Sequence, residues 1–531
     1  MAAGTVVSRA TGFARTAAIA FALGTGPLGD AFNTALIIPF IVFDLLLGGI
    51  LQSVVVPVLV RRRKQDPDQG QAYEQRLFSL VLLVLLGITA LAVAAAGLLI
   101  GLYTGKFTPE QQSLAVTFAR FFLVQIFFVG LGGLCGAMLN TRGRFGAPMW
   151  APVLNNLVII AVAGLFLAVT RGSATVESIT PGQVRFLGLG VTCGMVVQAA
   201  VLVVALRAAG FRPRPRFDFR HAGLGEIGRL ASWMLAYIVA TQVGFLVITN
   251  LATRAGRVAH TEGVPYGAGF TPYNYAYQLF QLPYAIVAVS VITALLPRLS
   301  GYATERRYDL LREEFSRGLR MTAVVIAPGA LVMAALGPPI AVLLFGHFNT
   351  SGADARFIGQ VLTAFALGLM PFSVFQLLLR VFYALHDTRT PAFISVANVA
   401  VSAGVGLLSY VLLPPGAIVV GLAAGFGLSY VVGCVIAWTT LSRRLGGMDG
   451  RRVVRALVRL HLAAVPSLVV ALAASLALQP AFGTGTLHAA LAIGVGGGLA
   501  AGLYLLAARV LRATEITEML ATVRARLPGR A

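Results

Sequence analysis

Long apolar runs without charge are the feature that most limits what this chain can fold into. Runs of about twenty uncharged residues, the length of a membrane-spanning helix, recur along its 531 residues. Only 11% of the residues are charged and 58% are hydrophobic, whereas soluble domains are roughly a quarter charged. Transmembrane β-barrels instead show short segments of alternating polarity. The chain is therefore predicted to be an all-α polytopic membrane protein, because helices satisfy their own backbone hydrogen bonds in lipid.

Fourteen transmembrane segments are predicted. They cover residues 5–24, 31–60, 77–103, 115–139, 147–170, 184–206, 230–253, 268–297, 321–345, 357–385, 391–413, 416–441, 454–478 and 486–508. The first segment carries two arginines and no small-residue cleavage site, so we expect it to remain as a span and not to be removed as a signal peptide.

Basic residues indicate the orientation of the spans. They gather after the even-numbered segments, as in the run Arg61-Arg62-Arg63-Lys64. The odd-numbered connections hold few, namely Lys106, Arg171, Arg185, Arg254, Arg257 and Arg356. Because basic loops stay in the cytoplasm, both termini are predicted to be cytoplasmic in the plasma membrane. The basic residues behind the net charge of +22 then reflect the orientation of the spans, and they attract anionic membrane lipids. The charge is therefore not evidence for a nucleic-acid partner, and we expect none.

Two landmarks recur at nearly one offset and indicate an internal duplication. Pro39 and Pro283 are 244 residues apart, and the pair Pro148 and Asn155 recurs 243 residues later as Pro391 and Asn398. Transporter folds often carry such repeats, with the substrate between them. We therefore predict two six-helix bundles and two extra C-terminal helices. The expected divisions are 1–210, 211–446, 447–512 for the last two spans, and 513–531 for a basic cytoplasmic tail.

A pair of arginines in the first span is the strongest functional signal. Arg9 and Arg15 lie in the sequence Ser8-Arg9-Ala10-Thr11-Gly12-Phe13-Ala14-Arg15. A cation within a span is costly unless it faces water, a partner or a substrate. Arg9 is close enough to the chain start to snorkel, whereas Arg15 sits about 9 Å deeper. The pair predicts a cationic cavity that receives an anion, because planar guanidinium groups suit phosphate oxygens.

Other polar residues have simpler alternatives. Asp30 is either a site acid or an acid favoured by the dipole at a helix N-terminus. Asp44, in mid-span by this prediction, is a candidate to pair with an arginine of the first segment, to balance the cavity charge or to carry a coupling proton. Snorkelling accounts for Arg120 and Arg380. An interfacial aromatic belt accounts for the alternating tyrosines at 273, 275 and 277.

No enzyme signature is present in the sequence. It contains no glycine-rich phosphate loop with a following lysine, no metal-ligand spacing and no nucleophile–base arrangement. The three cysteines, Cys135, Cys193 and Cys434, fall in apolar runs and predict neither a disulfide framework nor a metal site. We expect neither catalysis nor a cofactor.

Several short motifs together resemble the MurJ/MviN lipid II flippases of the multidrug/oligosaccharidyl-lipid/polysaccharide exporter superfamily. The resemblance extends over essentially the whole chain, and the run Leu45-Leu46-Leu47-Gly48-Gly49 is similar to the actinobacterial branch. The motifs are Ser8-Arg9-x-x-Gly12-Phe13-x-Arg15, Asp30-Ala31-Phe32, Leu139-Asn140-Thr141-x-x-Arg144-Phe145, Gln281-Leu282-Pro283, Leu296-Pro297-x-Leu299-Ser300 and Phe382-Tyr383-Ala384-x-x-Asp387-Thr388-Arg389-Thr390-Pro391.

The resemblance implies a substrate and a set of site residues. Such proteins carry lipid II, an undecaprenyl pyrophosphate bearing a disaccharide-pentapeptide, from the inner to the outer leaflet for peptidoglycan synthesis. The family's site residues match four positions, which are Arg9, Arg15, Asp30 and Thr271. The chain departs from the family at four others: Phe43 and Gln278 replace arginines, Gln281 replaces a glutamate, and Thr16 replaces an aspartate. Neutral donors such as Gln278 would then share the pyrophosphate with the arginines.

The expected mechanism is alternating access between the two bundles, with the lipid tail in an apolar groove formed by the last two spans. Sodium coupling is not expected, because the seventh, eleventh and twelfth segments carry no inward-facing acid. The alternatives are an exporter of another lipid-linked saccharide or an amphipathic drug, and a non-transporting scaffold that recruits cell-wall synthesis proteins. Paired arginines argue against cationic drugs, and the short tail after the last span argues against the scaffold.

Overall fold

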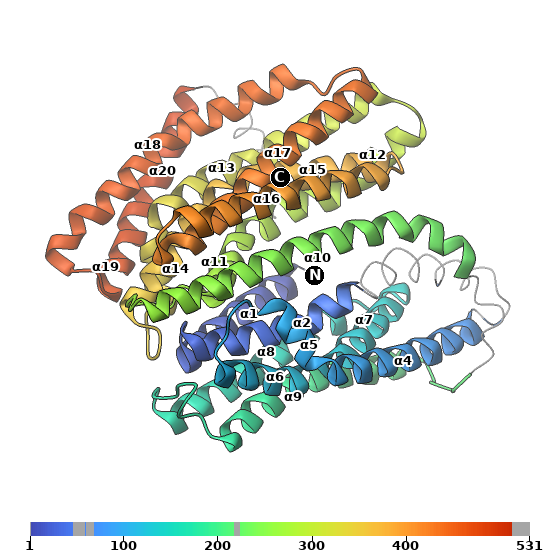
Figure 1. Ribbon diagram of the computed structural model, residues 1–531. Helices are drawn as coiled ribbons and strands as arrows, with labels where there is room; N and C mark the ends of the chain where they lie inside the picture. The colour runs from blue at the N-terminus through green and yellow to red at the C-terminus, as the bar shows by residue number, and fades with distance from the viewer. Residues whose placement is uncertain (1, 46–58, 60–67, 69, 217–223, 512–531) are drawn as a thin grey trace, which may run out of the picture. The chain divides into compact units, whose positions relative to one another are not determined.

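The fold consists of helices arranged in two compact units (Figure 1). The computed structural model describes residues 2–45, 59, 68, 70–216 and 224–511, and every regular element within those ranges is helical. The first unit holds Met1–Gly263 together with Gly269–Thr271 and Phe348–Thr350. The second unit holds Val264–Ala268, Pro272–His347 and Ser351–Ala531. The predicted tail at 513–531 and part of the predicted second segment lie outside the described residues.

The first unit contains the helices from the N-terminus to residue 261. They are α1 (Ala2–Leu23), α2 (Pro27–Phe43), α4 (Gln71–Ala94), α5 (Ala96–Tyr103), α6 (Pro109–Leu123), α7 (Gln125–Thr141), α8 (Gly146–Thr170), α9 (Pro181–Ala208) and α10 (Leu224–Thr261). Helix α1 packs against α8, and α2 packs against α6.

Local sequence signals set several helix starts. Thr108 accepts a hydrogen bond from the Gln111 N–H, and Pro109 follows in the first turn of α6, where a missing N–H costs nothing. Thr180 and Gln183 form a reciprocal capping box at the start of α9. These caps mark the residues at which α6 and α9 begin.

The core of the first unit is built on stacked phenylalanines. Phe32 meets Phe118 and Phe122 edge-on at centroid distances of 5.3 and 5.2 Å, and all three rings are buried. Lipid tails are as apolar as phenylalanine, so helix association in a membrane depends on close packing and not on a hydrophobic gain. Edge-to-face pairs contribute about 0.5–1.5 kcal/mol each, and these two join α2 to α6.

The second unit contains the helices from residue 272 onward. They are α11 (Phe270–Pro283), π-helix η3 (Tyr284–Ala288), α12 (Val289–Thr304), α13 (Tyr308–Phe345), α14 (Gly352–Leu367), α15 (Leu369–Ala384), α16 (Arg389–Leu412), 3-10 helix η4 (Pro415–Ala417), α17 (Ile418–Leu445), α18 (Gly450–Phe482), α19 (Thr486–Leu491), π-helix η5 (Ala492–Gly496) and α20 (Gly497–Val510). The first two residues of α11 belong to the first unit, so the chain passes between units within this helix.

Two of the three alternating tyrosines of α11 are buried and the third, Tyr277, is half-buried, so the prediction of an interfacial belt for them is wrong. Tyr273 is 5% exposed and Tyr275 is 1% exposed. Tyr273 packs edge-on against Phe365, and Tyr277 stacks on Phe280 at 5.9 Å. The tyrosines therefore belong to the aromatic core of the second unit.

A π-helical turn follows Pro283 in the same span. Proline lacks an N–H donor and crowds the preceding turn, and η3 follows it directly at Tyr284–Ala288. A π-turn accommodates one more residue than an α-helical turn. Beyond it, Ile292, Leu295 and Leu299 of α12 are buried at helical spacing.

Asp387 fixes the start of α16. Its Oδ1 accepts a hydrogen bond of 2.9 Å from the Thr390 N–H, and its Oδ2 accepts one of 2.6 Å from the Thr390 hydroxyl. Arg444 of α17 forms an ion pair with the same carboxylate. Partial burial alone would raise the pKa of Asp387, but the hydrogen bonds from Thr390 and Arg444 outweigh it and lower that pKa below its ordinary value.

The last two spans pack on α13 within the second unit. Helices α18 and α20 lie side by side in red in Figure 1 and contact α13. The Tyr504 hydroxyl of α20 donates a 2.8 Å hydrogen bond to the Val324 carbonyl of α13. Ala471 of α18 and Ala500 of α20 are fully buried. The groove for a lipid tail that the sequence predicts here stays a prediction.

The helices confirm a polytopic membrane fold. Within the described residues, 11 helices are long and apolar enough to cross a membrane, or up to 12 if the bent pair α14 and α15 is one span. Each of the fourteen predicted segments overlaps a helix. The count of fourteen spans stays a prediction, because α1 and α2 are not among the helices that are long and apolar enough to cross a membrane. Large apolar side chains such as Val169 and Val411 are about three-quarters exposed, at 75% and 76%, as expected for surfaces that face lipid.

The predicted repeat has a structural counterpart in each unit. A Cβ at Gly194 of α9 would lie 2.6 Å from Oδ1 of Asn155, which belongs to α8. In the repeat, a Cβ at Gly433 of α17 would lie 2.3 Å from Oδ1 of Asn398, which belongs to α16. Both amide oxygens are buried without a hydrogen-bond partner among the described residues. The same contact between consecutive spans thus occurs twice, whereas the bundle boundary at 210 stays a prediction.

Candidate functional site

Helix α1 presents the two predicted arginines differently. Arg9 is exposed and Arg15 is half-buried. The Nε atom of Arg15 is buried and has no hydrogen-bond partner among the described residues. Neither arginine forms an ion pair within the described ranges, so both guanidinium charges are available to a ligand. An unpaired cation of this kind inside a span is expensive to keep without a function.

Asn156 of α8 holds the part of α1 between the arginines. Its Nδ2 donates hydrogen bonds of 3.1 Å to Thr11 Oγ1 and 3.3 Å to the Ser8 carbonyl. An added Cβ at Gly12 would lie 3.5 Å from the same nitrogen, in ordinary van der Waals contact, so this approach does not require glycine. Ser8 and Gly12 thus lie on the side of α1 that meets α8. The sequence analysis did not single out Asn156, although an asparagine within an apolar span is a signal that the sequence contains.

Asp30 joins α2 to the first turn of α11. Its Oδ1 accepts a 2.7 Å hydrogen bond from the Thr271 N–H. Asn33, one turn later on α2, donates to Thr271 Oγ1 at 3.3 Å and to the Gly29 carbonyl at 3.0 Å. Asp30, Asn33 and Thr271 are all buried. The Asp30 carboxylate therefore caps the N-terminus of α11, where the helix dipole favours a negative charge.

Two glycines make room for the Asp30 carboxylate. A Cβ at Gly269 would overlap Asp30 Oδ2 and lie 2.7 Å from Cγ. A Cβ at Gly256 of α10 would lie 3.0 Å from Asp30 Oδ2 and 2.6 Å from the Gly269 Cα. Asp30 is therefore enclosed by backbone on these sides, in a niche that side chains larger than hydrogen would fill.

The remaining predicted site residues are in different surroundings. Asp44 follows the end of α2 and is exposed, and no ion pair joins it to Arg9 or Arg15 in the part of the chain that the structure describes. Gln278 and Gln281 are half-buried on the part of α11 that belongs to the second unit, and Gln281 is hydrogen-bonded to Tyr277.

Arg380 is a cation whose surroundings the sequence did not predict. Its guanidinium lies 5.7 Å from the ring centroid of Tyr383, within range of a cation–π interaction, and it is hydrogen-bonded to Tyr284. Its Nε is buried without a hydrogen-bond partner in the described residues. Arg120, in contrast, is exposed.

The helices define a class of protein, a polytopic helical membrane protein, whose α1 carries two arginines without an ion pair in the described residues. A solved structure titled "Lipid II flippase MurJ, inward closed conformation" has a TM-score of 0.75, with 18% identity over 97% of this chain and 99% of that one. An inward-facing multidrug resistance MATE family transporter of the MOP superfamily has a TM-score of 0.64, with 13% identity over 83% and 98% of the two chains. At these identities the similarity shows the fold.

Sequence comparison identifies the family within this class. The family model described as "Lipid II flippase MurJ" matches residues 19–493, and the chain belongs to this family. A probable lipid II flippase MurJ of Rhizobium meliloti (strain 1021) is 28% identical over 82% of this chain and 79% of its own length. The lipid II flippase MurJ of Burkholderia cenocepacia is also 28% identical, over 81% of this chain and 80% of its own.

Proposed function

We propose that this protein moves lipid II from the inner to the outer leaflet of the cell membrane. The observation that carries the proposal is the guanidinium of Arg15, half-buried within α1 with Nε unpaired among the described residues. A pyrophosphate supplies the oxygens that such a group lacks, and two forked hydrogen bonds to phosphate are among the stronger polar contacts in proteins. Membership of the lipid II flippase family supports the same substrate.

The proposed roles of the site residues follow from their surroundings. Arg9 and Arg15 contact the pyrophosphate, and the Ser8 carbonyl helps to keep α1 in register on α8, where Gly12 also lies. Asp30 and Thr271 act by fixing the first turn of α11. Gln278 and Gln281, further along α11, supply neutral hydrogen bonds at positions where the family has charged residues. No cofactor takes part in this scheme, because transport of a lipid needs no chemical step.

The transport cycle is proposed to use alternating access, with the undecaprenyl tail remaining in lipid beside the last two spans. An anion that leaves the cytoplasm is driven outward by an inside-negative membrane potential, at about 2.3 kcal/mol per charge per 100 mV. Both termini are proposed to be cytoplasmic. The divisions proposed from the sequence repeat are 1–210, 211–446 and 447–512.

The test is complementation of a flippase-depleted strain, with lipid II at the outer face as the readout. Arg9→Ala and Arg15→Ala should each abolish its appearance, whereas the lysine variants should retain part of it because charge remains and the forked geometry is lost. Arg120→Ala, at an exposed arginine of another span, is the matched control and should complement fully. Full complementation by both alanine variants would refute the proposed site.

Asp44 is proposed to balance the charge of the arginine pair when α1 and α2 approach in the cycle. Asp44→Asn should then reduce transport, and combining it with Arg15→Ala should cost less than the sum of the two effects. Strict additivity, with normal growth of the single variant, would leave Asp44 as an exposed polar residue without this role.

The two alternative functions predict different results in the same strain. An exporter of another lipid-linked saccharide would leave lipid II at the inner face while restoring a different glycan. A scaffold for cell-wall synthesis proteins would restore growth equally well with and without the arginines of α1.

A further inference from the structure

One face of α10 is tied to the connection between α5 and α6. The Thr253 hydroxyl of α10 accepts a 3.0 Å hydrogen bond from the Gly105 N–H. One turn later, Arg257 Nη1 donates a 2.8 Å hydrogen bond to the Lys106 carbonyl. Residues four apart lie on one face of a helix, so the same side of α10 holds two consecutive residues of the connection.

Arg254 lies on this side as well, against Gly105. A Cβ added at Gly105 would lie 2.0 Å from Cγ of Arg254 and 2.5 Å from its Nε, so any larger residue would displace the arginine side chain. The Nε is buried and has no hydrogen-bond partner among the described residues. Lys106 and Arg257 are exposed. Three cations from two elements of the first unit thus gather at one place, and we call Lys106, Arg254 and Arg257 the cation cluster.

No acid forms an ion pair with the cation cluster in the part of the chain that the structure describes. Glu110 and Glu262, two acids close to it in the sequence, are exposed. Glu177 of the connection after α8 interacts electrostatically with His260, one turn beyond the cluster on α10. Cations three residues apart on a helix repel each other, and an anionic ligand would relieve this repulsion.

The cation cluster departs from the charge pattern of the chain. In the proposed orientation it lies outside, where loops are usually poor in lysine and arginine, and its members are half of the six basic residues predicted there. The predicted spans 77–103 and 230–253 end within three residues of Lys106 and Arg254. The cluster is therefore at the level of the lipid headgroups, where it meets phosphates and not acyl chains.

We propose that the cation cluster is an exit site, which binds the pyrophosphate of the transported lipid when it reaches the outer leaflet. The inference rests on the proposed function and adds a second anion-binding site to the arginines of α1. Forked guanidinium groups match phosphate oxygens. A pyrophosphate carries more charge than the phosphodiester of a phospholipid, so it gains more from adjacent cations. The lipid tail stays in the hydrocarbon core and needs no contact with the cluster.

A purely structural role explains less of this arrangement. The hydrogen bond from Arg257 to the Lys106 carbonyl would by itself hold α10 on the connection, and it uses one N–H of the guanidinium. It does not account for Arg254, a second cation placed beside the first with its Nε unpaired in the described residues.

The test measures binding of farnesyl pyrophosphate, a soluble polyprenyl pyrophosphate, to the purified full-length protein by calorimetry. The measurements are made in a protein with Arg9→Ala and Arg15→Ala, which removes the site proposed on α1. In this background, Arg254→Gln combined with Arg257→Gln should weaken binding on the order of 25-fold, since each cation near an acidic headgroup contributes about fivefold. The corresponding lysine substitutions should keep most of the affinity.

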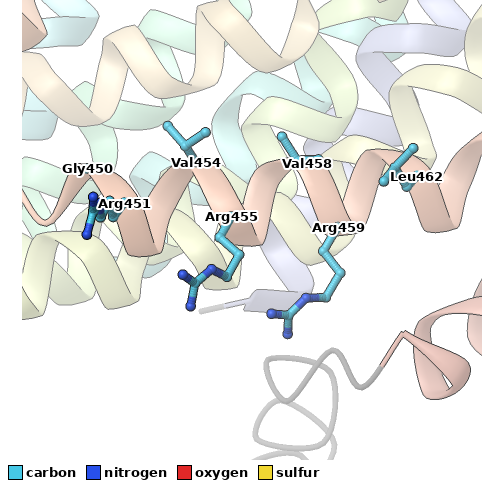
Figure 2. Close-up of a pocket in the computed structure, with 7 residues that line it drawn as sticks. All are labelled: Gly450, Arg451, Val454, Arg455, Val458, Arg459 and Leu462. Carbon is cyan, nitrogen blue, oxygen red and sulfur yellow. The ribbon is translucent and has the colours of Figure 1, made fainter.

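The charge-matched control is at the start of α18, where Arg451 and Arg455 extend from a single helix (Figure 2). Both are exposed, and this helix begins on the cytoplasmic side in the proposed orientation. Glutamine at both positions should change the affinity by less than about threefold, because charges separated by more than a Debye length are screened.

A second variant displaces Arg254 without changing any charge. Gly105→Ala should weaken binding about fivefold, the contribution of one cation, and the φ angle of Gly105 is not positive, so the backbone permits alanine. Gly101→Ala is its control, because nothing lies within 4 Å of a Cβ there, and the affinity should not change. Unfolding temperatures show whether each variant is folded, and Lys106→Gln, expected to cost about fivefold, serves if the arginine pair cannot be replaced.

Three results would overturn the exit site. The first is equal affinity of the Arg254 and Arg257 glutamine variant and the α18 control, or of Gly105→Ala and Gly101→Ala. The second is loss of all binding in the Arg9→Ala and Arg15→Ala background, which assigns the pyrophosphate to α1 alone and leaves the proposed function standing. The third is dihexanoyl phosphatidylglycerol binding as tightly as farnesyl pyrophosphate, which assigns the cluster to phospholipids of the outer leaflet. Failure of the proposed function is a separate result, read from complementation, and does not alter these affinities.

Discussion

The niche around Asp30 allows a stability prediction from a single methyl group. Gly269→Ala adds a Cβ whose three nearest atoms all belong to the Asp30 carboxylate. The φ angle of Gly269 is not positive, so alanine is not excluded by its backbone, and the cost comes from the overlap. Overpacking of a tight site costs about 1–3 kcal/mol. Displacing the carboxylate also leaves the Thr271 N–H without its acceptor, at about 1–3 kcal/mol.

The expected total is therefore roughly 2–6 kcal/mol. At about 2 °C per kcal/mol for a large domain, this corresponds to a fall in Tm of roughly 4–12 °C. The assay is thermal unfolding of the detergent-purified protein, monitored by loss of the monodisperse peak in size-exclusion chromatography. Gly26→Ala is the matched control, because nothing lies within 4 Å of a Cβ at that position, and its Tm should fall by no more than about 2 °C, the cost of alanine at the N-cap of α2.

A double substitution isolates the cause. Asp30→Ala removes the atoms that the new methyl would meet, so Gly269→Ala should cost about 1–3 kcal/mol less in that background than alone. If Gly269→Ala behaves like Gly26→Ala, or if the two effects add, then the carboxylate is not confined by Gly269 and the reasoning fails.

The hydrogen bonds of Asn156 and Asp387 and the orientation of the loops give three further predictions. Asn156→Ala should lower the Tm by about 2–6 °C and reduce transport, because the hydrogen bonds that hold α1 are lost. Asn155→Ala, at a buried neighbour whose oxygen has no partner among the described residues, should leave transport unchanged, since it loses packing against α9 and no bond to α1; an equal loss of transport in both variants would contradict this. Asp387→Asn should cost about 1 kcal/mol at neutral pH. Because the folded-state pKa of Asp387 lies below its unfolded value, the difference from the unchanged protein should begin to shrink as the pH falls below about 4 and should be lost once the pH falls through the folded-state pKa. A difference that does not change with pH would argue against the hydrogen-bonded carboxylate. In a protein whose three native cysteines are replaced, a cysteine at the exposed Glu177 should react with an impermeant maleimide outside intact cells and one at the exposed Arg214 should not; the reverse pattern would invert the proposed orientation.

The membrane spans could be predicted because their signal is local. A span needs only an uninterrupted apolar run, and each predicted run overlaps a helix. The repeat could also be predicted from the sequence, because the spacing between Asn155 and Asn398 matches that between Pro148 and Pro391. The place of Asp30 in the first turn of a helix was predicted correctly, but its bond to Thr271 joins residues 241 apart and has no local trace.

The surroundings of a polar or aromatic residue depend on segments that are distant in the chain, and these contacts could not be predicted from the sequence. Tyr273 looked interfacial because tyrosines alternate at 273, 275 and 277, yet Phe365 packs against it. Asn156 carried no sign that α1 would be its partner. Arg380 looked like a snorkelling residue, and only the fold brings Tyr284 to it.

The π-turn after Pro283 makes this part of the span more tolerant of a change in length than the regular helix beyond it. A π-turn holds one more residue than an α-helical turn, so deleting one residue from Tyr284–Ala288 would restore an α-helical turn and leave the residues beyond it on the same face. The side of α12 that carries Leu295, which contacts Gly318 of α13, would then face the same way. A deletion between Val289 and Leu295 would instead rotate that side by about 100°. Single-codon deletions in α12 should therefore be far more harmful than deletions within the π-turn, and relatives that lack the extra residue would keep the same face of the helix for this packing.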